Sequence, residues 1–161
     1  MKNRIDACFE KLKAENKKAL VTFITAGDPD MDTTEKCVLE MYKNGSDIIE
    51  IGVPFSDPIA EGATIQKASL RSLSGGTNLD KIFDLVRKLR TQTDKPMLLM
   101  MYINTIFKFG TAKFFELCKE TQIDALSFQI CLLKNVKSLR ARLRKMVSTL
   151  SSLLHRLHTS V

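Results

Sequence analysis

Short apolar runs that alternate with amphipathic segments constrain this fold more than any other feature of the sequence. The runs have the length of buried strands, and the stretches between them place apolar residues at helical spacing. Strands are expected over residues 19–24, 47–51 and 96–101, with a fourth beginning at 123, and helices around 5–12, 33–44, 62–73, 79–89 and 114–118. Strands separated by helices predict parallel βα units and an α/β fold.

Local signals bound several of these elements. A single buried stripe is expected on the first helix, formed by Ile5, Cys8, Phe9 and Leu12. The run at residues 19–24 suits a fully buried strand. Asp32 with Glu35 resembles a capping box for the second helix, and Asn78 is placed to cap the fourth. Residues 102–110 are expected to form a loop.

Two architectures fit parallel βα units, the closed barrel and the open doubly wound sheet. The sequence contains neither a Gly-x-Gly-x-x-Gly fingerprint nor a Gly-x-x-x-x-Gly-Lys phosphate loop. Carboxylate-rich loops follow the expected strands instead, and barrel enzymes place their chemistry in such loops. A (β/α)8 TIM barrel needs ~250 residues. The sequence therefore predicts the N-terminal part of such a barrel, about three and a half βα units.

The charge divides the chain into two parts. The whole sequence has 25 Lys and Arg against 18 Asp and Glu, a net charge of +7. All of this excess lies in residues 125–161, which contain no acidic residue and the basic residues Lys134, Lys137, Arg140, Arg142, Arg144, Lys145 and Arg156. We expect residues 1–124 to form the partial barrel domain and residues 125–161 an aberrant basic C-terminal tail, helical or disordered.

Several classes of protein are excluded by composition. No apolar run approaches the ~18 residues of a membrane span, and the charged N-terminus has no signal core, so we expect a cytoplasmic protein without membrane contact. The four cysteines, Cys8, Cys37, Cys118 and Cys131, show no Cys-x-x-Cys spacing and are expected to be reduced. His155 and His158 lack a further ligand nearby, and no metal site is expected.

Glu50 is a carboxylate within an otherwise apolar strand. Alternation along a strand directs it to the face opposite Ile49 and Ile51, and one face of a barrel strand is the interior. Removal from water there would favour its protonated form and suit it to proton transfer. The alternative is a structural Glu that pairs with a lysine or faces solvent.

The loop after this strand, residues 52–62, adds Asp57 and Glu61. Glu61 lies at an expected helix N-terminus, where the helix dipole favours a charged carboxylate. Glu50 and Glu61 would thus differ in proton affinity, as expected of an acid/base pair. The alternative is that Asp57 and Glu61 only satisfy backbone donors at a turn and a cap.

Four segments together resemble the tryptophan synthase alpha subunit. They are Phe-Ile-Thr-Ala-Gly-Asp-Pro (23–29), Ile-Glu-Ile-Gly-Val-Pro-Phe-Ser-Asp-Pro-Ile-Ala-Glu-Gly (49–62), Ile-Gln-Lys-Ala-Ser-Leu-Arg (65–71) and Met-Met-Tyr-Ile-Asn (100–104). The resemblance covers residues 1–124. It implies a (β/α)8 barrel and a lyase of tryptophan biosynthesis that cleaves indole-3-glycerol phosphate to indole and glyceraldehyde 3-phosphate by a retro-aldol reaction.

The resemblance also implies roles for individual residues. Glu50 matches the carboxylate that moves a proton to C3 of the indole ring. Glu61 matches the second catalytic carboxylate, usually Asp, which interacts with the indole N–H. Phe23 and Tyr102 match positions that line the indole pocket, with ordinary barrel packing as the alternative.

The same resemblance implies a partner and no cofactor in this chain. Asp57 and Asn104 match positions that face the tryptophan synthase beta subunit in an alpha2beta2 tetramer. Pyridoxal phosphate belongs to that beta subunit. The phosphate-binding loops of the family lie near strands seven and eight, and no residue here is matched to them.

The basic tail departs from the family pattern. Synonymous codons exist for residues 125–133 that, read one base earlier, give the family's Gly-Leu-Ile-Val-Pro-Asp segment, and residues 154–158 allow a second match in the same frame. This predicts a frameshift near residue 124 and a truncated chain. A basic helix that binds nucleic acid or anionic lipid is the rival reading, but alternate arginines at 140, 142 and 144 do not share one helical face.

We therefore expect a tryptophan synthase alpha chain with little or no activity on its own. A partial barrel would leave open strand edges and would lack the phosphate anchor that helps to position the reacting bond. The alternative is a non-catalytic interaction protein that retains the beta-contacting loops. Another phosphosugar barrel enzyme is disfavoured by the Pro-Phe-Ser-Asp-Pro block.

Overall fold

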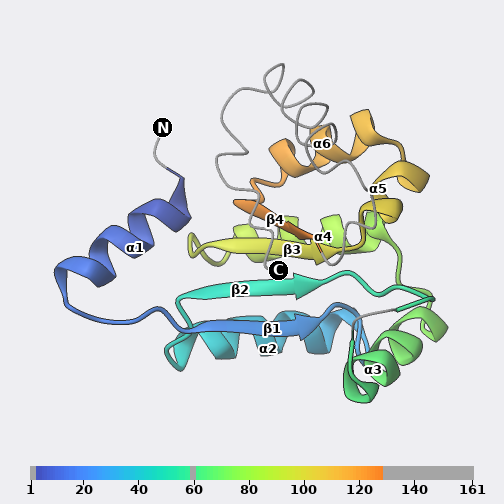
Figure 1. Ribbon diagram of the computed structural model, residues 1–161, viewed down its shortest axis with the longest axis horizontal. Helices are drawn as coiled ribbons and strands as arrows, with labels where there is room; N and C mark the ends of the chain where they lie inside the picture. The colour runs from blue at the N-terminus through green and yellow to red at the C-terminus, as the bar shows by residue number, and fades with distance from the viewer. Residues whose placement is uncertain (1–2, 59–60, 129–161) are drawn as a thin grey trace.

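A computed structural model of the chain describes residues 3–58 and 61–128. Within them, four strands form one parallel sheet in the order β1-β2-β3-β4: β1 (Val21–Thr25), β2 (Ile48–Gly52), β3 (Met97–Met101) and β4 (Ala125–Phe128). The helices are α1 (Arg4–Ala14), α2 (Met31–Lys43), α3 (Ala63–Ser74), α4 (Leu79–Arg90), α5 (Ile103–Phe109) and α6 (Thr111–Glu120). Each strand pairs with the next along the chain, which confirms the predicted parallel βα units (Figure 1).

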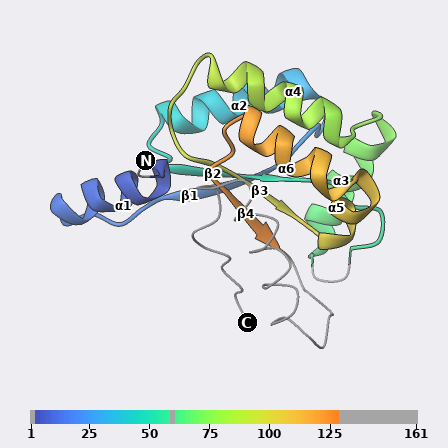
Figure 2. The ribbon, with the colours of Figure 1, turned by 90° about the horizontal axis from the view of Figure 1, so that it is seen from above.

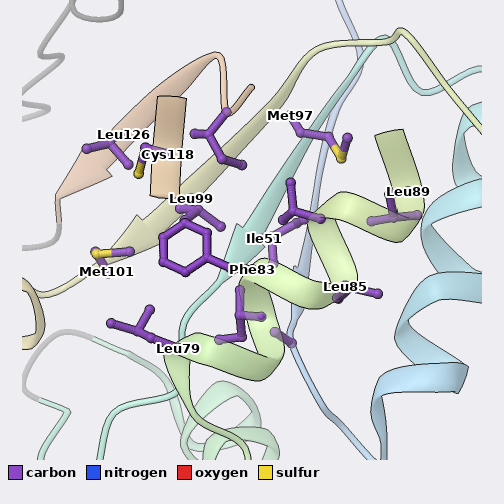
Figure 3. Close-up of a cluster of buried hydrophobic side chains, with 14 of the residues drawn as sticks. Ile51, Leu79, Phe83, Leu85, Leu89, Met97, Leu99, Met101, Cys118 and Leu126 are labelled. Atoms are coloured by element: carbon purple, nitrogen blue, oxygen red, sulfur yellow. The ribbon is translucent and has the colours of Figure 1, made fainter. Parts of the chain in front are cut away.

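Helices α2, α4 and α6 lie on one face of the sheet (Figure 2). The strands present alternate apolar side chains to this layer, and these side chains are buried: Ile49, Ile51, Met97, Leu99, Met101 and Leu126. Figure 3 shows several of them packed against α4. This interface between helices and sheet is the core of the described residues.

Helix α4 contributes most to this core. It buries six apolar residues: Leu79, Ile82, Phe83, Leu85, Val86 and Leu89. The Phe83 ring is fully buried and meets the Phe114 ring edge-on, with centroids 5.6 Å apart. Full burial of one such side chain contributes about 1.5–3 kcal/mol, so α4 is fixed mainly by the hydrophobic effect.

Helix α1 lies at the end of the sheet where the strands begin (Figure 1). The Asn3 side-chain amide donates to the backbone oxygen of Asp124 at 2.8 Å, and the Arg4 guanidinium lies 3.3 Å from the Asp124 carboxylate. The expected buried stripe is wrong for Phe9, which is 45% exposed, whereas Leu12 is buried. Polar contacts at its first turn hold this helix, so it does not need the full stripe.

Three local expectations about caps have different outcomes. The N-cap of α2 is Asp30, two residues before the expected Asp32, and its carboxylate accepts from the backbone N–H of Thr33 at 2.6 Å. Glu35 is not a capping residue, because its buried carboxylate lies 2.6 Å from the Lys88 ammonium. The Asn78 cap is confirmed, with its side-chain oxygen accepting from the backbone N–H of Lys81.

Two segments differ from the sequence prediction in their structure or burial. Residues 103–109 form α5 rather than a loop, although no side chain caps this helix. Tertiary burial of Ile103 and Ile106 stabilises it, and no local sequence pattern predicts that burial. The first strand begins at Val21 and is not fully buried, since Val21 is 48% exposed. Its position at the edge of the described sheet leaves its first residue open on one side.

The described residues end within the segment that was expected to differ in character. Residues 125–128 form β4 beside β3, and Leu126 joins the core. The rest of the predicted basic tail, including Cys131, His155 and His158, lies outside the described residues. Cys8, Cys37 and Cys118 are free thiols, and burial raises the pKa of Cys118. No helix among residues 3–58 and 61–128 has the length and apolar character needed to cross a bilayer.

Candidate active site

Glu50 lies on the sheet face opposite the helix layer. Its neighbours Ile49 and Ile51 are fully buried against the helices, and strand alternation turns Glu50 the other way. In the parallel register Glu50 lies between Phe23 of β1 and Leu98 of β3, so these three side chains share one face. Glu50 is half-buried there. This is the face that closure of a barrel would turn inward.

Phe23 covers the strand end beside Glu50. A Cβ atom added to Gly52 would lie 2.5 Å from the Phe23 ring, so only a glycine leaves room for the ring at this position. Gly52 shares the face of Glu50, two residues further along β2. The structure therefore brings Phe23 and Glu50 to the same face, with the aromatic ring toward the carboxyl end of the sheet.

The loop after β2 brings Glu61 to the carboxyl end of β3. The backbone N–H of Val53 donates to the Met100 oxygen at 2.8 Å, which continues the sheet pairing into the loop. The Phe55 ring then stacks on the Tyr102 ring with centroids 4.6 Å apart. The Tyr102 hydroxyl donates to the Glu61 carboxylate at 2.6 Å. Two residues expected to belong to one site, Tyr102 and Glu61, are thus in direct contact.

The contact between Tyr102 and Glu61 depends on side chains that fix both groups. Tyr102 is only 5% exposed, so its hydroxyl has a defined position. The Gln66 side-chain amide donates to the backbone oxygen of Glu61 at 2.9 Å, and this bond links Glu61 to the first turn of α3. Sequence reasoning missed both Phe55 and Gln66. An aromatic residue within a loop is the signal that could have identified Phe55.

Asp57 and Asn104 are exposed and line one open pocket of about 660 Å³. This pocket also includes Phe55, Lys108 and Phe109. The Ser56 hydroxyl donates to the Asp57 carboxylate. The structure thus brings together the two residues expected to face a partner, at the same end of the sheet as Tyr102.

The arrangement suits proton transfer to an apolar, planar molecule. One carboxylate, Glu50, lies on an inner face beside an aromatic ring, and a second, Glu61, is held by a buried phenol. Among residues 3–58 and 61–128 no group of three His, Cys, Asp or Glu side chains could hold a metal ion. The same residues contain neither the Gly-x-Gly-x-x-Gly nor the Gly-x-x-x-x-Gly-Lys pattern of known phosphate-binding loops.

Comparison with known proteins identifies the family of this chain. A family model described as tryptophan synthase alpha chain matches residues 9–148, which extends past the boundary expected at residue 124. The tryptophan synthase alpha chain of Caldanaerobacter subterraneus subsp. tengcongensis is 51% identical over 124 residues, which cover 77% of this chain and 47% of that protein. The alpha chain of Geotalea uraniireducens is 55% identical over 112 residues, 70% of this chain and 42% of the relative.

Solved structures of tryptophan synthase also match this chain. The crystal structure of tryptophan synthase subunit alpha from Legionella pneumophila str. Paris matches with a TM-score of 0.84 and 35% identity, over 91% of this chain and 56% of that one. The tryptophan synthase complex from Pyrococcus furiosus matches with a TM-score of 0.72 and 33% identity, over 80% and 53%. The chain spans about half the length of the curated relatives it matches. The described strands and helices are thus the first half of a (β/α)8 barrel, and the chain belongs to the tryptophan synthase alpha chain family.

Proposed function

We propose that this chain carries the proton-transfer residues for retro-aldol cleavage of indole-3-glycerol phosphate into indole and glyceraldehyde 3-phosphate. The observation that carries the proposal is a pair of carboxylates: Glu50 on the sheet face shared with Phe23, and Glu61 held by Tyr102 at the carboxyl end of β3. Phe23 and Tyr102 supply the aromatic surfaces that an indole ring requires.

In the proposed reaction, Glu50 donates a proton to C3 of the indole ring. Protonation there places positive charge on the indole nitrogen, and the Glu61 carboxylate accepts the N–H hydrogen bond and stabilises that charge. The adjacent carbon–carbon bond then breaks and its electrons neutralise the ring. The hydroxyl on the departing carbon gives its proton to the Glu50 carboxylate, so that the fragment leaves as an aldehyde and Glu50 is protonated again. The Tyr102 hydroxyl directs the Glu61 carboxylate toward the carboxyl end of β3.

The proposed partner is a tryptophan synthase beta subunit. Asp57 and Asn104 support this proposal because both are exposed and line one pocket beside the site. The proposed alpha reaction needs no cofactor in this chain, and pyridoxal phosphate would belong to the partner. A cytoplasmic location is part of the same proposal.

These 161 residues alone are proposed to cleave indole-3-glycerol phosphate slowly or not at all, since no described residue is assigned to the phosphate group. The test mixes the purified chain with a beta subunit and measures indole released from indole-3-glycerol phosphate. Release that disappears in Glu50→Gln, but persists in the exposed control Glu40→Gln, supports the lyase. Measurable release that is equal in Glu50→Gln and the unmodified chain excludes the role of Glu50. A rate near that of full-length relatives excludes the proposed low activity.

The second candidate function is a non-catalytic partner of the beta subunit. The exposed pair Asp57 and Asn104 favours it, because the described residues that line their pocket all lie between positions 53 and 109. Co-purification with the beta subunit without any indole release would support this function. Loss of co-purification in Asp57→Ala with Asn104→Ala would connect the interaction to the pocket, and unchanged co-purification would exclude the pocket as the contact.

A further inference from the structure

Helix α3 is held in place differently from the other helices near the site. Its buried residues are Ala68, Ser69 and Ser72, which are small, and two of them carry hydroxyl groups. Of its three large apolar residues, Leu70 is 58% exposed, and Ile65 and Leu73 are only half-buried. Small or partly exposed side chains bury little apolar area, so the hydrophobic effect fixes this helix less firmly than it fixes α4. Polar contacts therefore contribute much of what determines where α3 lies.

The strongest polar contact of α3 joins it to the turn after β1. The Arg71 guanidinium donates through Nε to Oδ1 of Asp28 and through Nη2 to Oδ2, both at 2.7 Å. Such a two-bond pair fixes orientation as well as distance. Asp28 is well covered, with only 17% of its side chain exposed, and the pair raises the pKa of Arg71.

The same turn contacts α3 at a second point. The Ser72 hydroxyl, which is fully buried, donates to the backbone oxygen of Ala26. Gly27 lies against Ser72 and Thr77 so closely that an added Cβ would overlap the Thr77 hydroxyl. The C-terminal half of α3 is thus attached to residues 26–28, directly after β1.

The first turn of α3 is attached to Glu61. Gln66 holds the backbone oxygen of Glu61, and the Glu61 carboxylate accepts from Tyr102. A helix moves as a rigid rod over this length, so a shift or rotation at Arg71 is transmitted to Gln66 and Glu61. A chain of contacts through α3 thus connects the distant pair of Arg71 with Asp28 to the contact between Glu61 and Tyr102.

We propose that the Arg71–Asp28 pair positions Glu61 by fixing α3 against the turn after β1. Arg71 is then a positioning residue, which acts on the site through the helix and not by contact with substrate. The catalytic meaning of this position rests on the proposed function of Glu61. Lysine presents a single point charge and cannot reproduce the two-bond geometry, so Arg71→Lys is expected to retain only part of the effect.

The test compares Arg71→Gln and Arg71→Lys in the full chain by amide hydrogen exchange. Loss of the pair in Arg71→Gln should speed exchange in α3 by about threefold to fivefold, while exchange in α4 is unchanged. The exchange rate of α3 in Arg71→Lys should lie between those of the unmodified chain and Arg71→Gln. Arg87→Gln is the matched control, because Arg87 of α4 also forms ion pairs, with Asp84 and Glu120, away from the site. It should leave α3 exchange unchanged.

Tyrosine fluorescence supplies a readout at the site itself. The chain has no Trp and 2 Tyr, so Tyr42→Phe as background leaves Tyr102 as the sole fluorophore. Hydrogen bonding to a carboxylate quenches a phenol, so Arg71→Gln should increase Tyr102 emission, as Glu61→Gln should. A merely structural role of Arg71 would leave this emission unchanged.

Two results would overturn the positioning role. One is unchanged Tyr102 emission in Arg71→Gln, whether or not exchange in α3 changes, and the other is an equal rise of exchange in α3 and α4, which would indicate general destabilisation. Failure of the proposed function is distinguishable, because it is measured by indole release in Glu50→Gln. Altered exchange and emission in Arg71→Gln, with release independent of Glu50, would retain the positioning role of Arg71 and remove only the catalytic assignment.

Discussion

Helices α3 and α4 follow one another along the chain, have 12 residues each, and are held by opposite means. Helix α4 buries six large apolar side chains against the sheet, whereas α3 buries only Ala68, Ser69 and Ser72. Apolar burial tolerates small rotations because it is non-directional, but hydrogen bonds such as Arg71 to Asp28 fix a direction. The helix that contributes most to the core, α4, thus differs from the helix proposed to position Glu61, α3. Substitutions in the two helices can therefore test stability and positioning separately.

Phe83→Ala should have the largest effect on stability. Phe83 is fully buried and packs on the Phe114 ring, so removal of its ring leaves a cavity and costs about 3–5 kcal/mol of unfolding free energy. Chemical denaturation followed by circular dichroism measures this cost. Leu70→Ala, on the exposed side of α3, is the control and should cost less than about 1 kcal/mol. Equal costs for the two variants would contradict the contrast between the helices.

Gly27→Ala tests the turn that holds α3. Gly27 has φ +75°, and a Cβ there would overlap Thr77, so left-handed strain and steric overlap together should cost about 2–4 kcal/mol. Gly45→Ala provides the comparison, since Gly45 has φ +105° with open space around it, and should cost about 1–2 kcal/mol. Denaturation midpoints of the two variants give the difference. If Gly45→Ala proves as costly as Gly27→Ala, close packing of the turn on α3 is not what matters.

Tyr102→Phe should have a smaller effect, confined to the site. It removes one hydroxyl and its bond to Glu61, and the expected cost is about 0.5–1.5 kcal/mol. Tyr42→Phe is a matched substitution in the core, where the hydroxyl donates to the backbone oxygen of Pro96 at 2.6 Å. Amide exchange should increase near Glu61 only in Tyr102→Phe. Faster exchange there in Tyr42→Phe as well would show that the effect is not local.

The smallest expected effect is a pH dependence at the contact of α4 with α2. Hydrogen bonds from Lys88 and Gln92 lower the pKa of the Glu35 carboxyl. A carboxyl with a lowered folded-state pKa adds stability that is complete above its unfolded pKa, ~4.3, and that is lost as the pH falls through the folded value. Urea midpoints of the unmodified chain and Glu35→Gln should therefore differ more at about pH 6 than at about pH 3.

Asp32→Asn serves as the control for that pH dependence. Asp32 lies 3.8 Å from the same Lys88 ammonium but is 82% exposed. Solvent screens such a pair, so the variant should follow the unmodified chain at every pH. If Asp32→Asn flattens the pH dependence as much as Glu35→Gln, burial of Glu35 is not the cause.

Much of the fold could be predicted because its signals are local. The alternation of strands and helices, the Asn78 cap and the direction of Glu50 opposite Ile49 all follow from periodicity and side-chain chemistry. The predictions failed where tertiary burial replaced local signals. Helix α5 forms around buried Ile103 without a cap, Phe9 is exposed although its spacing is helical, and Glu35 pairs with Lys88 rather than capping α2.

The amino-acid sequence by itself determined the parallel α/β class, the family resemblance and the candidate carboxylates Glu50 and Glu61. Only the tertiary structure decided how Glu61 is held. Its carboxylate bonds Tyr102, which lies far along the chain beyond β3, and Gln66 links it to α3, the helix whose Arg71 bonds Asp28 after β1. Hydrogen bonds depend on distances and directions that periodicity does not encode. The candidate carboxylates could therefore be identified from the sequence, whereas Phe55, Gln66 and the contacts that orient Glu61 required the fold.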